Sequence, residues 1–176
     1  PRHLGLILAL SGGVDSMALA HCLIQIRKKM AFRLAFAHLN HTLHNEADRA
    51  AECCKVFAKE NKVNYYSKDL YFKDHVNFEA NAREKRYNYL NRIAEKEHYH
   101  FIITAHHKND QIETVFMKQY KNSDWISQIG IREELGKVIR PLLNVSKTDI
   151  IRYAKENHCS CMKGSKLQFL KVLQYV

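Results

Sequence analysis

The most constraining feature of the chain is an apolar run near its start that leads directly into a glycine-rich turn. Residues 4–10 carry no charge and predict a strand buried on both faces. Residues 11–16, Ser-Gly-Gly-Val-Asp-Ser, then open a helical pattern. Two glycines let the backbone approach a ligand closely, and the free N–H groups of a first helical turn favour an anion. The stretch predicts a phosphate site; a plain turn, in which Ser11 or Asp15 only caps the helix, is the alternative.

Strand-like and helix-like segments alternate about five times along the chain. Further strands are predicted at 33–39, 63–66, 101–104 and 137–140, helices at 45–61, 78–98, 110–120 and 146–157, and a surface loop at 67–77. This alternation is typical of a doubly wound α/β domain, with a mostly parallel five-stranded sheet and helices on both faces. Because ligands bind beyond the carboxyl ends of parallel strands, we expect residues 11–16 and 106–114 to meet.

Charge and hydropathy narrow the class of partner. The 176 residues contain 28 Lys and Arg against 18 Asp and Glu, a formal net charge of +10. Such an excess predicts an anionic partner larger than a nucleotide, and RNA fits better than a membrane. No apolar run approaches the ~18 residues of a membrane span, and the apolar start is too short for a signal peptide. We therefore expect a cytoplasmic protein without a membrane partner.

The cysteines and histidines do not form a metal-binding pattern. Cys53 and Cys54 are adjacent within a predicted helix, and Cys159 and Cys161 are one residue apart, so neither pair has C-x-x-C spacing. We expect the five cysteines to be reduced and structural. The histidines around residues 38–44 lack matched partners, so a zinc site is not expected.

The turn at residues 11–16 differs from two common phosphate loops. No Lys follows its second glycine, as a Walker loop requires, and it is not G-x-G-x-x-G. It resembles the pyrophosphate loop, or PP-loop, of the N-type ATP pyrophosphatases, which cleave ATP to AMP and pyrophosphate while adenylating a carbonyl oxygen. The resemblance implies an adenine nucleotide alpha-hydrolase-like fold. It also implies that ATP is held by Ser11, Gly12, Gly13, Val14, Asp15 and Ser16.

Four further stretches resemble motifs of one branch of that superfamily, the tRNA(Ile)-lysidine synthetases. They lie at residues 38–43, 77–87, 105–114 and 140–143, and with the loop they span residues 4–157 in the family's order. Such enzymes join lysine to C2 of the anticodon wobble cytidine of an isoleucine tRNA through an adenylated tRNA intermediate, releasing AMP and pyrophosphate. The resemblance implies a ligase with ATP and Mg²⁺ as cofactors, and with L-lysine and tRNA as partners.

The same resemblance assigns roles to single residues. The catalytic residues are Asp15, Arg83 and Asp110; His38 and Asn40 join the ATP site; Glu79, Arg86, His106, Asp110, Glu113, Thr114 and Arg140 contact lysine or tRNA; and Asp15 and Asp110 hold Mg²⁺. The chemistry suits these residue types, because guanidinium groups bind phosphate oxygens and carboxylates bind Mg²⁺ or an ammonium. The alternatives are a solvated basic face for the arginines and helix capping for Asp110 and Glu113.

The sequence departs from the family in two places. Position 109 is Asn, where the family usually has a second acidic residue. Residues 158–176 lack the expected acidic stretch, so we expect a catalytic domain at 1–157, an atypical tail at 158–176, and no C-terminal tRNA-binding domains. Two other functions remain open. One is a tRNA thiolase of the same superfamily, which would need spaced thiols; the other is a truncated, non-catalytic nucleotide- or RNA-binding module.

Overall fold

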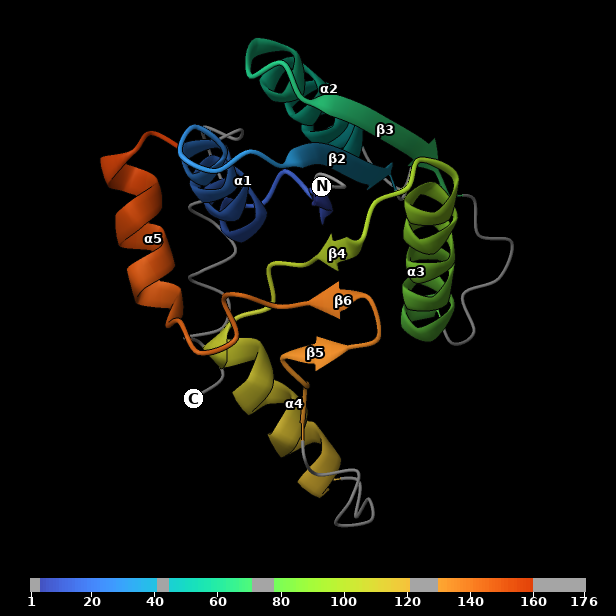
Figure 1. Ribbon diagram of the computed structural model, residues 1–176. Helices are drawn as coiled ribbons and strands as arrows, with labels where there is room; N and C mark the ends of the chain where they lie inside the picture. The colour runs from blue at the N-terminus through green and yellow to red at the C-terminus, as the bar shows by residue number, and fades with distance from the viewer. Residues whose placement is uncertain (1–3, 41–44, 71–77, 121–129, 160–176) are drawn as a thin grey trace.

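The computed structural model describes residues 4–40, 45–70, 78–120 and 130–159, and strands alternate with helices through most of them (Figure 1). Side chains of residues 45–46 and 78–80 are outside this description. The elements in chain order are β1 (Gly5–Ala9), α1 (Val14–Arg27), β2 (Arg33–Asn40), α2 (Asn45–Glu60), β3 (Asn64–Asp69), α3 (Phe78–Lys96), β4 (Phe101–Ile103), α4 (Lys108–Tyr120), β5 (Glu134–Leu135), β6 (Val138–Ile139) and α5 (Lys147–Glu156).

The strands of the described residues form one sheet in the order β3-β2-β1-β4-β6-β5. Neighbouring strands are parallel except for the pair β5 and β6. The chain first adds β2 and β3 on one side of β1 and then crosses to place β4 on its other side. This confirms the doubly wound fold and puts the switch point between β1 and β4, where ligands bind in such sheets.

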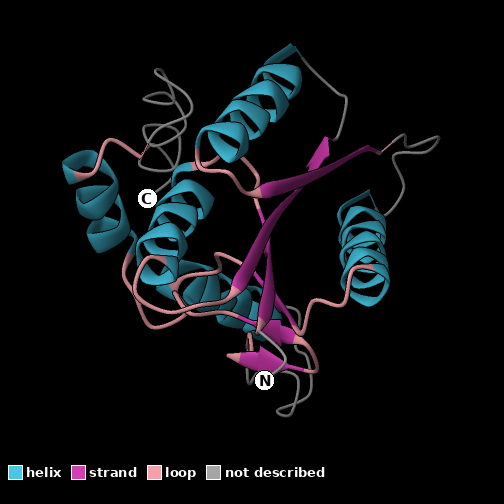
Figure 2. Cartoon of the chain, turned by 45° about the horizontal axis from the view of Figure 1, so that its top comes forward, coloured by secondary structure: helices cyan, strands magenta, loops and turns pink. Residues whose placement is uncertain are grey.

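Helices cover both faces of the sheet, as predicted (Figure 2). Adjacent residues of β1 face opposite sides. Leu8 packs in a cluster with Leu23 of α1 and Cys54 of α2. Ile7 packs on the other face with Leu90 of α3. Because β1 is buried on both sides, the loop that follows it starts from a rigid base.

The sheet has six described strands rather than the predicted five. The additional strand, β5, pairs antiparallel with β6 through the register Glu134↔Ile139 and Leu135↔Val138. The two-residue connection contains Gly136 at φ +59°, a conformation that favours glycine. A strand of two exposed residues shows no hydrophobic periodicity, so only the glycine could have indicated this hairpin.

Strand β3 continues to Asp69, so the prediction of a loop from residue 67 was wrong at its start. Residues Ser67 to Asp69 pair with His38 to Asn40 of β2. This edge strand is held mainly by backbone pairing. Its last three side chains are polar and exposed, so the sequence shows no hydrophobic pattern there. Residues 71–77 of the predicted loop lie outside the described residues.

Two further observations concern thiols and membranes. Cys22, Cys54 and Cys159 are free, whereas Cys53 is disulfide-bonded, so the expectation that all cysteines are reduced was wrong for Cys53. Cys54 is fully buried in the core, whereas its neighbour Cys53 is only half-buried. In the described part of the chain, no helix combines the length and apolar character that crossing a membrane requires.

Candidate functional site

The glycine-rich loop leaves β1 and turns tightly beneath α2. Gly12 has φ +82°, in the left-handed region that favours glycine. A Cβ atom at this position would lie 3.1 Å from the Cβ atom of Ala50 and 3.4 Å from the Sγ atom of Cys54. Conformation and packing against α2 therefore both require glycine here.

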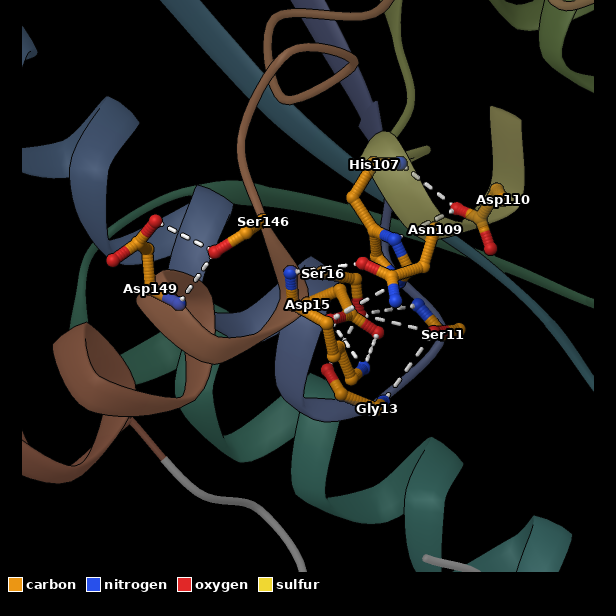
Figure 3. Close-up of polar contacts among 10 residues, drawn as sticks. Ser11, Gly13, Asp15, Ser16, His107, Asn109, Asp110, Ser146 and Asp149 are labelled. Atoms are coloured by element: carbon orange, nitrogen blue, oxygen red, sulfur yellow. Dashed lines mark hydrogen bonds and ion pairs between the residues drawn. The ribbon is translucent and has the colours of Figure 1, made fainter. Parts of the chain in front are cut away.

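Two serines hold the loop in shape (Figure 3). The Ser11 backbone N–H donates to Ser16 Oγ over 3.2 Å, and the two hydroxyl oxygens are 3.0 Å apart. Gly13 N–H donates to Ser11 Oγ, and the Ser16 hydroxyl donates to the Gly13 carbonyl. The N-cap residue of α1 is Gly13, which has no side-chain cap, so neither Ser11 nor Asp15 is merely a capping residue. The first N–H groups of α1 are thus available to an anion.

A cavity of about 300 Å³ opens where the loop meets the carboxyl ends of β2 and β4. Its lining includes Ser11, Asp15 and Ser16 from the loop region, together with His106 and Asp110 from the segment after β4. The structure therefore brings together the two segments that the sequence pattern placed at one sheet edge.

His38 and Asn40, at the end of β2, also line this cavity. His38 is buried, and its Nδ1–H donates to the Leu10 carbonyl over 2.8 Å, which leaves Nε2 as the acceptor. Among the described residues Nε2 has no hydrogen-bond partner, and burial lowers the pKa of this imidazole. Asn40 donates from Nδ2 to Asp48 of α2 over 2.8 Å.

Two carboxylates, Asp15 of α1 and Asp110 of α4, lie next to the buried imidazole of His107. Asp110 accepts the His107 backbone N–H at 2.8 Å, so it caps α4 from the third helical position. His107 Nε2 lies 3.7 Å from Asp15 Oδ1, and its Nδ1 lies 3.6 Å from Asp110 Oδ2. Asp15 and Asp110, expected to bind Mg²⁺, therefore contact opposite nitrogens of His107 (Figure 3).

Arginines supply positive charge on the other side of the cavity. Arg86 of α3 lines it, and burial lowers the pKa of its guanidinium. Arg83, one turn earlier, is exposed, with its guanidinium carbon 5.2 Å from the centre of the Tyr87 ring.

The arginines affect the protonation of His106, which also lines the cavity. Its pKa is lowered to about 4, first by burial and then by Arg140, with smaller effects of Arg83 and Arg86 in the same direction and an opposing effect of Asp110.

Arg140 occupies a different position from the other expected substrate residues. It is 2% exposed, and its guanidinium donates to the Arg132 carbonyl over 2.6 Å and to the Tyr87 hydroxyl over 3.4 Å. These contacts tie the β5–β6 hairpin to α3. Further along α4, Glu113 is exposed and Thr114 is half-buried, and neither lines the cavity. The Glu79 side chain, like residues 41–43 of the second motif, lies outside the described part of the chain.

One contact at the loop was missed by the sequence reasoning. The Lys147 ammonium lies 2.5 and 2.6 Å from the two carboxylate oxygens of Asp15. Ser146 caps α5, the helix predicted at 146–157; its Oγ accepts the Asp149 N–H at 3.1 Å. The sequence signal for this contact was the position of Lys147 directly after the cap. A helix that follows a strand of this sheet starts at the same edge as the loop, so its first residue lies near the loop.

Comparison with known proteins identifies the family. A family model described as a PP-loop domain matches residues 2–165. The chain belongs to the PP-loop domain family. This PP-loop domain is 37% identical to a tRNA(Ile)-lysidine synthase of Streptococcus equi over 152 residues, and 33% identical to one of Enterococcus faecalis over 160 residues. These alignments cover 84% and 87% of the chain, and they confirm the resemblance to that branch.

The chain spans about a third of the length of these relatives, 35% and 34% respectively. Among solved structures, a U34-tRNA thiolase from Methanococcus maripaludis matches with a TM-score of 0.77 at 19% identity, over 93% of this chain and 60% of its own. A glutamine-dependent NAD⁺ synthetase from Acinetobacter baumannii matches with a TM-score of 0.60 at 15% identity, over 99% of this chain and 35% of its own. At such identities the two structures support the fold alone.

Proposed function

We propose that this PP-loop domain binds ATP in the cavity between β1 and β4 and uses it to ligate lysine to C2 of the wobble cytidine of an isoleucine tRNA. One observation carries the proposal: the loop at residues 11–16 and the start of α4 line the same cavity. The match to the PP-loop domain, at residues 2–165, extends through both segments. ATP, lysine and tRNA are therefore the proposed ligands.

The loop and the end of β2 suit a nucleotide. Anionic phosphates fit the N–H groups at the start of α1, where a helix dipole also favours negative charge. His38 Nε2 offers a buried hydrogen-bond acceptor to the nucleotide, which would remove the cost of an unpaired polar atom. Gly12 lets the backbone come close without a side chain between loop and ligand.

The donors around His107 suit a divalent cation. Asp15 and Asp110 supply carboxylate oxygens, the ligand type that Mg²⁺ prefers, and both line the cavity. When bound there, Mg²⁺ would neutralise charge on the ATP phosphates. Asp15 and Asp110 are the residues proposed to hold it.

The proposed reaction has two steps. The C2 oxygen of cytidine attacks the α-phosphorus of ATP, an O–P bond forms, and pyrophosphate leaves. The lysine ε-amine then attacks C2, AMP leaves with the oxygen, and the amine loses a proton. Arg83 and Arg86 stabilise charge on phosphate oxygens, because guanidinium groups donate hydrogen bonds in a planar fork. Asp110, which lines the cavity, holds the incoming ammonium, and Asp15 or Asp110 accepts its proton.

A tRNA thiolase is the second candidate, because the M. maripaludis thiolase has the same fold and fold alone does not separate the two reactions. The thiols support it less well. Burial raises the pKa of Cys54 to about 12, which keeps this thiol protonated and unreactive. Cys22 and Cys159 lie on α1 and after α5, and neither lines the cavity. The relatives at 33–37% identity and the position of these thiols therefore favour lysine ligation.

The deciding experiment follows two labels through one reaction. The protein is incubated with α-³²P-labelled ATP and an isoleucine tRNA whose wobble base is cytidine, and ¹⁴C-lysine is added afterwards. We expect ³²P on the tRNA before lysine is added, and its replacement by ¹⁴C afterwards. A tRNA with uridine at that position is the substrate control, and Asp15→Asn is the protein control.

Each alternative gives a different result. Transfer of ³²P that lysine does not displace, but a sulfur donor does, would favour a thiolase. ATP binding without any label on tRNA would favour a non-catalytic module.

A further inference from the structure

The loop contains no cation of its own. Residues 10–16 include neither Lys nor Arg, whereas a Walker loop carries a lysine that reaches the phosphates. The fold instead places a lysine from a distant part of the sequence beside the loop. Lys147, 132 positions after Asp15 in the sequence, places its ammonium 2.5 and 2.6 Å from the Asp15 carboxylate oxygens.

The position of this ammonium is electrostatically costly without an anion. Lys147 is the first residue of α5, and Asp15 belongs to the first turn of α1. The ammonium thus lies near the positive ends of two helix dipoles, where anions are favoured and cations are not. It is also largely removed from water, with the side chain only 20% exposed. Asp15 offsets this cost while no ligand is bound.

The backbone of Lys147 is fixed toward the same cavity. Its N–H donates to Asn109 Oδ1 of α4 over 3.2 Å, and Ser146 caps the helix that it begins. The neighbouring Lys108 N–H donates to the Val145 carbonyl over 3.0 Å. These bonds hold the start of α5 against the start of α4, which leaves the flexible side chain of Lys147 as the movable part. Asp15, the ion-pair partner of the Lys147 ammonium, lines the cavity.

From this geometry we propose that Lys147 binds the β- and γ-phosphates of ATP, and that its ion pair with Asp15 holds the ammonium ready in the free protein. The inference rests on the proposed binding of ATP at this loop. It gives Asn109 a role as well, because the amide oxygen of Asn109 holds the backbone of the phosphate-binding lysine. A four-carbon side chain can carry its ammonium from the carboxylate to an adjacent phosphate without movement of α5.

The test compares ATP with AMP, which lacks the two phosphates in question. Calorimetric titrations of both nucleotides are made with wild type, Lys147→Met and Lys147→Arg. Lys155→Met, an exposed lysine on the same helix, is the matched control. We expect Lys147→Met to weaken ATP binding by about 10- to 100-fold, the worth of one charge-assisted hydrogen bond, and to leave AMP binding unchanged. Lys147→Arg should retain most of the ATP affinity, and Lys155→Met all of it.

Several outcomes would overturn the inference. Equal losses of ATP and AMP in Lys147→Met would show that the ion pair with Asp15 is only structural, and unchanged ATP binding would show that the lysine does not reach the phosphates. Both leave the proposed function intact. If wild type binds no ATP, the proposed function falls and this inference with it. Thermal melting of each variant confirms folding, and Lys147→Gln, which removes the charge but keeps a hydrogen-bond donor beside Asp15, carries the comparison of ATP with AMP if Lys147→Met unfolds.

Discussion

The Nδ1 atom of His106 lies 2.9 Å from the hydroxyl oxygen of Thr104, two residues back at the end of β4. Thr104 is buried, so this bond fixes the imidazole at the edge of the cavity. Burial and the nearby guanidinium groups of Arg140, Arg83 and Arg86 oppose protonation of the ring, and Asp110 only partly offsets them.

His106 should therefore remain neutral until the solution is strongly acidic. Burial and the arginines lower its pKa from 6.5 to about 4 in the folded chain. The unfolded chain binds the extra proton first, so the free energy of unfolding should fall as pH is lowered from about 6.5 to about 4. Histidine-selective NMR titration measures the pKa directly, and urea unfolding of His106→Asn should show a weaker pH dependence. A midpoint near 6.5 would show that the cavity is wet and lacks the positive field.

Replacing Gly12 by Ala should destabilise the fold more than the same change at Gly136. Both glycines have positive φ, +82° and +59°, so each substitution costs about 1 to 2 kcal/mol of backbone strain. Only at Gly12 does the new methyl meet Ala50, and overpacking adds about 1 to 3 kcal/mol there. Urea unfolding of the two variants measures the difference. Equal losses would mean that α2 moves aside at no cost.

Arg83→Ala should slow adenylation more than it weakens ATP binding. Its exposed guanidinium is free to meet charge that develops on phosphate in the transition state. We expect pyrophosphate release to fall by about 100-fold while ATP affinity stays unchanged. Arg92→Ala, an exposed arginine on the same helix, is the control. Equal losses in both measurements would assign Arg83 to ground-state binding instead.

The chain should bind tRNA weakly and with strong dependence on salt. Its net charge of +10 favours phosphate contacts, and each neutralised phosphate adds about 0.9 to the slope of log K against log salt. Because the chain spans 35% of its S. equi relative, we expect little preference for isoleucine tRNA over another tRNA. Filter binding at several salt concentrations tests both points. Tight, salt-insensitive binding of one tRNA would place specificity within this domain.

The parts of the fold that the sequence predicted share one property: burial. β1, β2 and β4 carry continuous apolar residues because helices cover both faces of the sheet, and such runs are readable without a structure. The end of β3 and all of β5 lie at the sheet edges, where backbone pairing with a neighbour replaces burial. Neither segment therefore shows a hydrophobic pattern in the sequence from which a strand could be predicted.

The site divides in a similar way. The loop at residues 11–16 was readable because turn, strand end and helix start are adjacent in the sequence. The ion pair of Asp15 and Lys147 was not, since it depends on how α5 returns to the sheet. Arg140, expected near the substrate, is almost fully buried, and its guanidinium donates to the Arg132 carbonyl and the Tyr87 hydroxyl, contacts that depend on tertiary packing rather than on local sequence.

The two edge strands have a consequence for self-association. An unpaired strand edge is a template onto which a second chain can add by backbone pairing. Here β5 offers only two residues, and β3 ends in Lys68 and Asp69, whose charges would have to be desolvated by an incoming strand. Both borders of the sheet therefore discourage the growth of intermolecular β-structure, and amyloid-like stacking of folded chains is disfavoured at each of them.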